Sequence, residues 1–287
     1  MERIELEQYT KLWLRNKLTV DAYESAVNIY LKQNNYRLYK YQSPFTVKDG
    51  PNFKEKVFDR FYNHIKHQTM TISAPSMFND PFDCQYALPP NCNAKATEVL
   101  KMANDCYNRV GCLAENYDNR LMWSHYGGAH QGVCIEYDMA NFSTAEANCF
   151  FAPIIYATER VKIPPRLIDP NTPNHPISSH EESILREALF TKDKIWSYEK
   201  EWRIIKRGDY TKEAAGYMNF SMPPIRAIYL GAAISNTVNW KDNKRDCFLE
   251  RLAELKELCE EKRIRLQMLS LNPATYDLQL GKCITAQ

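Results

Sequence analysis

Two acidic pairs have a spacing that could support chemistry. Glu199 and Glu201 stand in the segment IWSYEKEWRII, and Glu136 and Asp138 stand in GVCIEYD. Residues i and i+2 of a β-strand point to the same face, so each pair shares one environment if its segment is extended. Two neighbouring carboxylates raise each other's pKa, and one can then act as a base while the other stabilises a cationic centre. Cleavage of a glycosidic bond passes through such a centre.

Two other roles for these acidic pairs remain open. Glu199 and Glu201 could lie on a solvated strand face and form ion pairs with Arg203 or with the neighbours of Lys200. If the two acidic pairs met, they could bind a divalent cation, as in a metal-dependent nuclease. The sequence alone does not decide among these roles.

A second motif, TISAPSMFNDPFD, spans residues 71–83. Its Asn79-Asp80-Pro81 run favours a turn in which the Asn or Asp side chain bonds the local backbone. The structural interpretation is that Phe78 and Phe82 hold this turn against the core. The functional interpretation is that Asn79, Asp80 and Asp83 present an amide and carboxylates to a ribose or a base.

A third motif, MWSHYGGAHQGVCIEYD, spans residues 122–138 and is rich in polar aromatic side chains. His125 lies between Trp123 and Tyr126, and histidine is the residue type best suited to acid–base work or substrate anchoring near neutral pH. The spacing of His125, His130 and Cys134 matches no closed zinc site. We therefore predict no metal here.

Apolar spacing predicts where the helices and strands lie. The segment 163–180, rich in Pro, Asn and His, is long enough to be a lid. Irregular alternation of strands and helices predicts an α+β fold with a mixed or antiparallel sheet and flanking helices. We expect an N-terminal helical extension over 1–35 and a single α+β domain over 36–287. Helices are predicted over 4–33 (two, the second capped by Asp21), 53–67, 95–109, 181–193 and 246–262, and strands over 37–41, 69–73, 109–114, 132–138, 199–206, 225–230 and 264–271.

Four segments together resemble a widespread bacterial family of unknown function. Its members carry LYKYRS-like, FNDPFD, MWxHYxxxHxGxCIEFD and YExEWR motifs in this order, and the resemblance covers about residues 36 to 280. The family label supplies no activity. The matching segments are LYKYQS (38–43), TISAPSMFNDPFD (71–83), MWSHYGGAHQGVCIEYD (122–138) and IWSYEKEWRII (195–205).

The order of these elements is also similar to the arginine-serine-glutamate branch of the ADP-ribosyltransferase superfamily. In that branch a basic residue opens the site, a Ser-x-Ser-like strand braces the NAD pocket, and a Glu-x-Glu strand carries the catalytic carboxylates. The basic residue matches Lys40 or Arg37, and the first strand matches Thr71 with Ser73. The glutamate strand matches residues 199–201. The sequence departs from the pattern in having Thr-Ile-Ser in place of Ser-Thr-Ser.

This second resemblance implies an ADP-ribosyltransferase-like fold and an enzyme that uses NAD as a substrate, modifying a macromolecular or small-molecule acceptor. A toxin, effector or phage-defence role would suit this chemistry. We expect Ser73, His125 and Glu201 to converge on one cleft. A non-catalytic module that binds a nucleotide or base is the alternative from another class. Taking this resemblance together with the motifs, we expect Glu201, Glu199 and His125 to be the catalytic residues. The expected cofactor-binding residues are Tyr39, Lys40, Thr71, Ser73, Asn79, Asp80, Trp123 and Tyr126.

Composition limits the partners. The formal net charge is +2, so no global basic field indicates nucleic acid, although a local basic groove is compatible with this value. The nine cysteines contain no CxxC unit, which is typical of reduced thiols in the cytosol. The first residues lack the apolar core of a secretory signal, and no run approaches the ~20 apolar residues of a membrane span. We expect a cytoplasmic protein with a small-molecule nucleotide ligand and no membrane partner.

Overall fold

The computed structural model describes residues 1–45, 51–90, 92, 94–168, 177–212, 216–234 and 242–285. The fold is α+β, with a mixed, mostly antiparallel sheet and flanking helices, as predicted. The chain forms two compact units, each assembled from three segments. Unit 1 comprises Met1–Asn35, Thr71–Cys112 and Ser143–Asn219, and unit 2 comprises Tyr36–Met70, Leu113–Phe142 and Phe220–Gln287. The expected division into a helical extension and a single domain stays a prediction.

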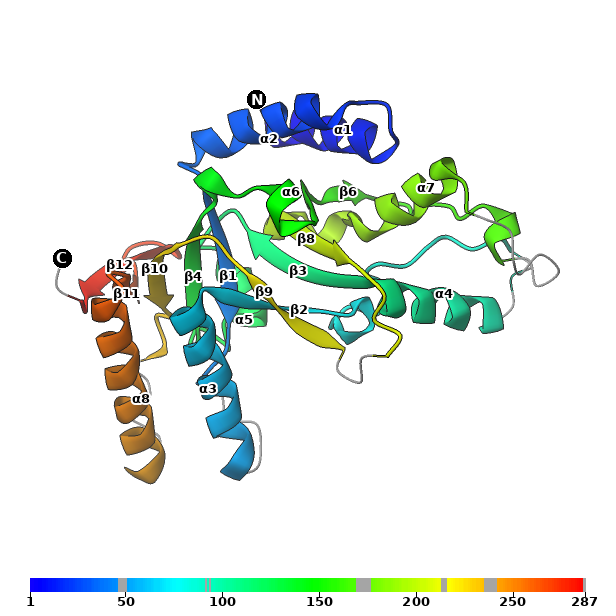
Figure 1. The fold of residues 1–287 in the computed structure, drawn as a ribbon. Helices are drawn as coiled ribbons and strands as arrows, with labels where there is room; N and C mark the ends of the chain where they lie inside the picture. Colours follow the sequence, from blue (N-terminus) through cyan, green and yellow to red (C-terminus); the bar gives the residue numbers. More distant parts are fainter. Residues whose placement is uncertain are drawn as a thin grey trace. The chain divides into compact units, whose positions relative to one another are not determined.

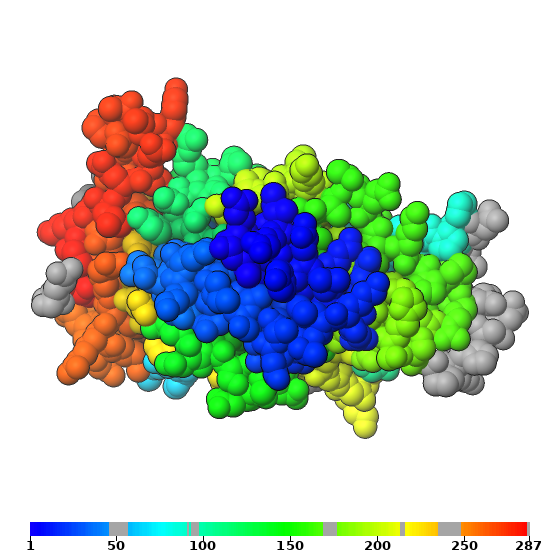
Figure 2. Space-filling view, turned by 90° about the horizontal axis from the view of Figure 1, so that it is seen from above, coloured from blue at the N-terminus to red at the C-terminus, as the bar shows by residue number. Residues whose placement is uncertain are grey.

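Unit 1 begins with two packed helices, α1 (Arg3–Leu14) and α2 (Val20–Gln33), which run side by side in Figure 1. The Thr19 hydroxyl accepts a hydrogen bond from the backbone N–H of Ala22 and caps α2, so the predicted capping role of Asp21 is wrong. Helix α1 also packs against α7 (Ser179–Leu189), whose yellow-green surface adjoins the blue helices in Figure 2. Unit 1 also contains the helix α4 (Ala94–Tyr107) and the short helix α6 (Thr144–Ala147).

The sheet of unit 1 centres on β8 (Glu201–Arg207), which pairs with β5 (Phe150–Pro153) and β3 (Asn108–Ala114). Ser73 of β2 (Thr69–Ser73) pairs with Val110 of β3, and β9 (Tyr217–Ser221) follows β2. A separate parallel pair is formed by β6 (Ile155–Ala157) and β7 (Thr191–Asp193). Short 3₁₀ turns complete the unit: η1 (Pro75–Met77), η3 (Pro165–Ile168) and η4 (Lys194–Glu199).

Unit 2 contains strands in the order β12 (Leu278–Cys283), β11 (Arg265–Leu271), β10 (Ile225–Leu230), β4 (Val133–Asp138) and β1 (Arg37–Gln42). Strands β10 and β11 are parallel and the other pairs are antiparallel. Helices α3 (Pro51–His67) and α8 (Asp242–Glu261) lie side by side (Figure 1), and α8 packs on β11. The short helix α5 (Arg120–His125) contains the start of the third motif, β4 contains its end, and the turn η2 (Met139–Asn141) follows it.

Most predicted elements are confirmed within two or three residues, and the exceptions have local causes. The predicted helix 181–193 ends at Leu189, because residues 191–193 form β7 against β6. The predicted strand 199–206 begins at Glu201. Residues 169–176 of the predicted lid lie outside the described residues. Among the described residues, no helix combines the length and apolar character needed to cross a membrane.

Candidate functional site

Unit 1 contains a buried group of charged side chains, which we call the charge network. Asp83, Lys192, Glu199, Glu201 and Arg203 are each no more than 8 % exposed. Three of them are carboxylates and two are cations, so the five together carry a formal charge of −1. Burial of unpaired charges is costly, and the network persists because each charge has opposite charges as neighbours.

Arg203 is the most buried member, with no exposed surface. Its Nε donates to Glu201 Oε1 at 2.7 Å, and its Nη2 donates to Asp83 Oδ2 at 2.6 Å and to Glu201 Oε2 at 3.3 Å. Its Nη1 donates to the Leu189 carbonyl at 2.7 Å and contacts Cys84 Sγ at 3.2 Å. Five acceptors thus match the five N–H groups of the guanidinium, which fixes its orientation.

Lys192 joins the carboxylates on the other side of the network. Its ammonium lies 2.5 Å from Glu199 Oε2, 2.9 Å from Glu201 Oε2 and 3.7 Å from Asp83 Oδ2. The alternation of β7 turns Lys192 inward, while Asp193 is exposed. Both predicted catalytic glutamates therefore converge on a single ammonium group.

The two glutamates do not share a strand, so this part of the prediction is wrong. Glu199 ends η4, Lys200 takes the left-handed conformation (φ 44°, ψ 50°), and Glu201 begins β8. The left-handed residue redirects the chain between the two side chains, yet both carboxylates still reach Lys192. The two carboxylates are therefore brought together by the turn at Lys200 and by the ammonium group of Lys192.

The expectation that a neighbouring carboxylate raises the pKa of Glu201 is also wrong. Burial by itself raises the pKa of Glu201, but the charges of Arg203 and Lys192 outweigh burial and hold that pKa well below its usual range. Burial lowers the pKa of Lys192, but Glu201 and Glu199 raise it above its usual range. Glu201 is therefore a carboxylate at neutral pH and a weak base.

A cavity of about 300 Å³, the network cavity, adjoins the charge network. Asp83 and Lys192 belong to its lining, so two network members face it directly. The lining also contains Asp80, Glu159 and Asp193 as further carboxylates and Arg160 as a second cation. Phe82 also lines this cavity and is 65 % exposed, with the Arg160 guanidinium 5.2 Å from its ring centroid.

The FNDPFD turn separates this cavity from a smaller one of about 170 Å³. Asp80 Oδ1 accepts from the Phe82 backbone N–H at 2.8 Å, which confirms the predicted side-chain bond to the local backbone. Asn79 lines the smaller cavity and Asp80 lines both. The expectation that Phe82 holds the turn against the core is wrong because its ring is largely exposed, whereas Phe78 lies against the Arg203 guanidinium at 5.4 Å.

Thr71 and Ser73 lie on β2 of unit 1 with half-buried side chains, and neither lines the network cavity. They alternate with the buried Ile72, so they share one face of the strand. The convergence of Ser73, His125 and Glu201 joins residues of different units and stays a prediction.

The other predicted site residues belong to unit 2. Trp123 is fully buried, its Nε1 donates to the Tyr117 carbonyl at 2.7 Å, and its ring meets Tyr41 edge-on, so it is a core residue there. His125 is exposed at the end of α5, and its ring lies 6.2 Å from that of Tyr126. A pocket-lining role requires an accessible surface, which Trp123 lacks.

Tyr39 and Lys40 lie on β1, Tyr39 buried and Lys40 half-buried. Tyr39 packs beside a stacked pair of rings, Tyr117 and Tyr229, whose centroids are 4.4 Å apart. The Tyr229 hydroxyl donates to Glu136 Oε2 at 2.6 Å.

The second acidic pair is held by arginines of unit 2. Glu136 is 1 % exposed and lies 3.3 Å from Arg37 Nε. Asp138 pairs with Arg226 at 2.6 Å. Both carboxylates therefore already have cationic partners. No three His, Cys, Asp or Glu side chains in the described part of the chain are arranged to hold a metal ion.

The site residues that were not predicted include its three cations, Lys192, Arg203 and Arg160. Arg203 appeared in the sequence only as an ion-pair partner of the glutamates, and this pairing is observed with Glu201. Lys192 was hidden by the helix prediction, which ignored the alternation of Thr191-Lys192-Asp193. Arg160 stands in a segment without a clear period, so nothing in the sequence placed it beside Phe82.

Comparison with known proteins gives one partial match. The family described as "Protein of unknown function (DUF2971)" matches residues 122–204, which include the third motif and the network residues Lys192, Glu199, Glu201 and Arg203. The match is consistent with the resemblance to an uncharacterised family. No curated protein and no solved structure matches the chain.

Proposed function

We propose that the protein is an NAD-using transferase similar to ADP-ribosyltransferases, and that NAD binds in the network cavity of unit 1. The observation that carries this proposal is the mixed lining of the cavity. The carboxylates of Asp80, Asp83 and Asp193 line the same cavity as the cations Lys192 and Arg160. A dinucleotide needs cations for its phosphates and acceptors for its ribose hydroxyls, and this lining offers both.

The rim of the cavity suits a planar base. The exposed ring of Phe82 carries the Arg160 guanidinium on one side. An aromatic ring left in water beside a cavity offers a stacking surface, and a guanidinium attracts both the ring and a phosphate.

The reaction requires a negative group beside the ribose. When the bond between the ribose carbon and the nicotinamide nitrogen breaks, nicotinamide leaves with the bonding electron pair and positive charge develops on the ribose. A carboxylate in contact with this charge stabilises it. A nucleophile of the acceptor then bonds to the same carbon and loses its proton.

The carboxylates of the cavity and those of the charge network have different proposed roles. Asp80 and Asp83 line the cavity and are the proposed contacts of the ribose. Glu201 is bound by Arg203 and Lys192 and does not line the cavity, so we assign it a positioning role. Glu199 likewise acts through Lys192.

The test combines calorimetry of NAD binding with a measurement of nicotinamide release. Phe82→Ala removes an exposed ring, so folding should be unchanged, while loss of base stacking worth ~1–3 kcal/mol should weaken NAD binding by about 5- to 150-fold. Tyr276→Ala is the matched control, because Tyr276 is 86 % exposed and also carries an arginine, Arg120, at 5.6 Å. The control variant should bind NAD like the wild type.

Asp80→Asn tests the chemistry. The amide oxygen can still accept from Phe82 N–H, so the turn should persist, whereas the loss of charge should slow nicotinamide release by roughly 10²-fold. NAD binding without release by the wild type would refute the transferase and leave a nucleotide-binding module. Absence of NAD binding would refute the NAD-using transferase and NAD as the ligand of the network cavity.

A further inference from the structure

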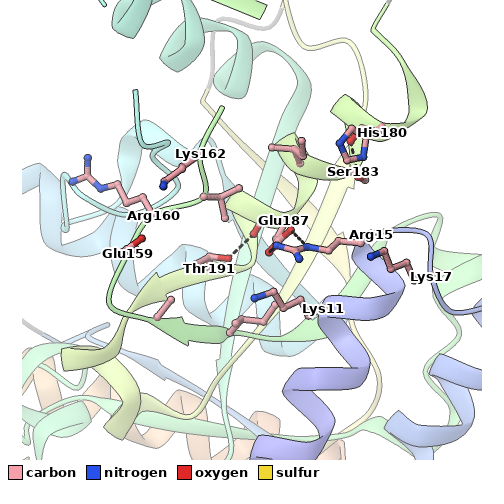
Figure 3. Close-up of a pocket in the computed structure, with 14 residues that line it drawn as sticks. Lys11, Arg15, Lys17, Glu159, Arg160, Lys162, His180, Ser183, Glu187 and Thr191 are labelled. Carbon is pink, nitrogen blue, oxygen red and sulfur yellow. Dashed lines mark hydrogen bonds and ion pairs between the residues drawn. The ribbon is translucent and has the colours of Figure 1, made fainter. Parts of the chain in front are cut away.

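Another cavity of unit 1, about 460 Å³ in volume, is strongly basic, and we call it the basic cavity. It is formed by the last turns of α1 and the residues after it, by residues 155–162, and by α7 with Thr191. Figure 3 shows Lys11, Arg15 and Lys17 on one side and Arg160 and Lys162 on the other. Five cationic side chains face two carboxylates, Glu159 and Glu187. The lining therefore has an excess of three positive charges.

Glu187 neutralises one of these cations. Its two carboxylate oxygens accept from Arg15 Nε at 2.7 Å and from Arg15 Nη2 at 2.9 Å, and Glu187 is buried (Figure 3). This bidentate pair holds the end of α1 against α7. It therefore belongs to the wall of the cavity.

The other cations on the lining are left for a ligand. Among the described residues, Lys11, Lys17 and Lys162 form no ion pair with any carboxylate, and Arg160 only contacts the Phe82 ring. Lysines that share a concave surface repel one another, and an anion that enters the cavity relieves this repulsion.

The cavity also has an apolar part. Ile155, Ala157, Val161 and Ile184 contribute to its lining. An apolar surface with cations on two sides favours a ligand that combines phosphate groups with a ring, as a nucleotide does.

We propose that the basic cavity is a binding site for the phosphate groups of a phosphorylated ligand. Lys11 and Lys17 approach these groups from α1 and its following turn, and Lys162 approaches them from the opposite side. Two sources of the phosphates are compatible with this chemistry. The basic cavity and the network cavity share Ala157, Glu159, Arg160 and Thr191, so a dinucleotide in the network cavity can extend its phosphates here. A separate phosphorylated molecule can also bind. The site itself does not depend on the transferase activity.

The test uses inorganic pyrophosphate as the probe, titrated calorimetrically into the full chain. The double variant Lys17→Glu with Lys162→Glu reverses two exposed cations that have no carboxylate partner, so it should fold normally. Lys32→Glu with Lys66→Glu makes the same change in net charge at exposed positions outside the cavity and is the matched control. We expect pyrophosphate binding to weaken about tenfold or more in the first variant and to stay unchanged in the second. Binding by the wild type should also weaken as salt is raised.

Three results would overturn the proposal: no binding of pyrophosphate by the wild type, unchanged binding by the Lys17/Lys162 variant, or an equal loss in the control. A competition arm identifies the source of the phosphates. If NAD displaces pyrophosphate, the phosphates are those of the ligand in the network cavity, and if both bind together, the ligand is a separate molecule. Pyrophosphate binding without any NAD binding would refute the proposed function and keep this site.

Discussion

Replacing Arg203 with methionine tests how much unit 1 depends on the charge network. Methionine keeps an unbranched side chain of similar length but removes the guanidinium, so Glu201 loses its 2.7 Å partner and Asp83 its 2.6 Å partner. Both carboxylates are buried, and Glu201 does not line the network cavity, so water does not replace the donor that Glu201 loses. Lys192 remains 2.9 Å from Glu201 and 3.7 Å from Asp83 and compensates in part.

The expected loss follows from the charges involved. Two unit charges about 4 Å apart at an effective dielectric constant of about 20 interact with about 4 kcal/mol. Removing one partner of a buried ion pair is observed to cost about 3–5 kcal/mol. Each kcal/mol of lost stability lowers the melting temperature of a unit of this size by about 2–4 °C. The melting temperature of Arg203→Met should therefore lie about 6–20 °C below that of the wild type.

Thermal unfolding followed by circular dichroism measures this loss. Arg207→Met is the control, because Arg207 lies on the same strand and forms an ion pair with Glu182 in which both side chains are more than two-fifths exposed. This exposed pair should contribute little.

A double-mutant cycle decides whether the pairing itself is responsible. Glu201→Gln in the Arg203→Met background removes one uncompensated charge, so the double variant should be about 1–3 kcal/mol more stable than the sum of the single effects predicts. Strict additivity, or a melting temperature for Arg203→Met equal to that of Arg207→Met, would refute the reasoning.

Three further predictions concern pH, the core and the backbone. The folded-state pKa of Glu201 lies below its unfolded value of about 4.3, so the contribution of Glu201 to stability is complete above about pH 5 and is lost as the pH falls. Between about pH 5 and pH 3 the unfolding free energy of Glu201→Gln should therefore change less than that of the wild type, by a difference of at most ~1.4 kcal/mol per pH unit. Equal pH dependence of the two proteins in urea unfolding would contradict this. Trp123→Ala should cost about 3–5 kcal/mol in urea unfolding because the ring is fully buried, whereas His125→Ala should leave stability nearly unchanged; similar losses would contradict the assignment. Lys200→Gly should raise the melting temperature by a few degrees because glycine relieves about 1 kcal/mol of left-handed strain at φ 44°, and a lower melting temperature would show that no strain is stored there.

The sequence was sufficient for most regular elements. Strand β10 matches its predicted range of 225–230, and β2 matches 69–73, because alternating apolar residues report directly on a half-buried strand. Strands β5 and β6 were missed, since each is three or four residues long and shows too little of a period. Strand β7 was absorbed into a helix prediction because its pairing with β6 is a long-range contact that a local pattern does not contain.

The candidate site was predicted only in part, for a similar reason. The glutamates and the FNDPFD turn were found because their residue types are unusual and closely spaced. Their partner Lys192 comes from a parallel strand pair, and Asp83 contacts Arg203 across 120 positions of sequence. The pKa of Glu201 depends on these contacts, so its direction was not predictable from two neighbouring carboxylates alone.

The most direct test of the central claim is a crystal structure of the protein grown with NAD. The proposal predicts density for the dinucleotide in the network cavity, with a base against Phe82, a phosphate within reach of Arg160 or Lys192, and a ribose beside Asp80 or Asp83. Dinucleotide density at another place on the chain, or an empty network cavity at NAD concentrations that saturate calorimetric binding, would contradict it.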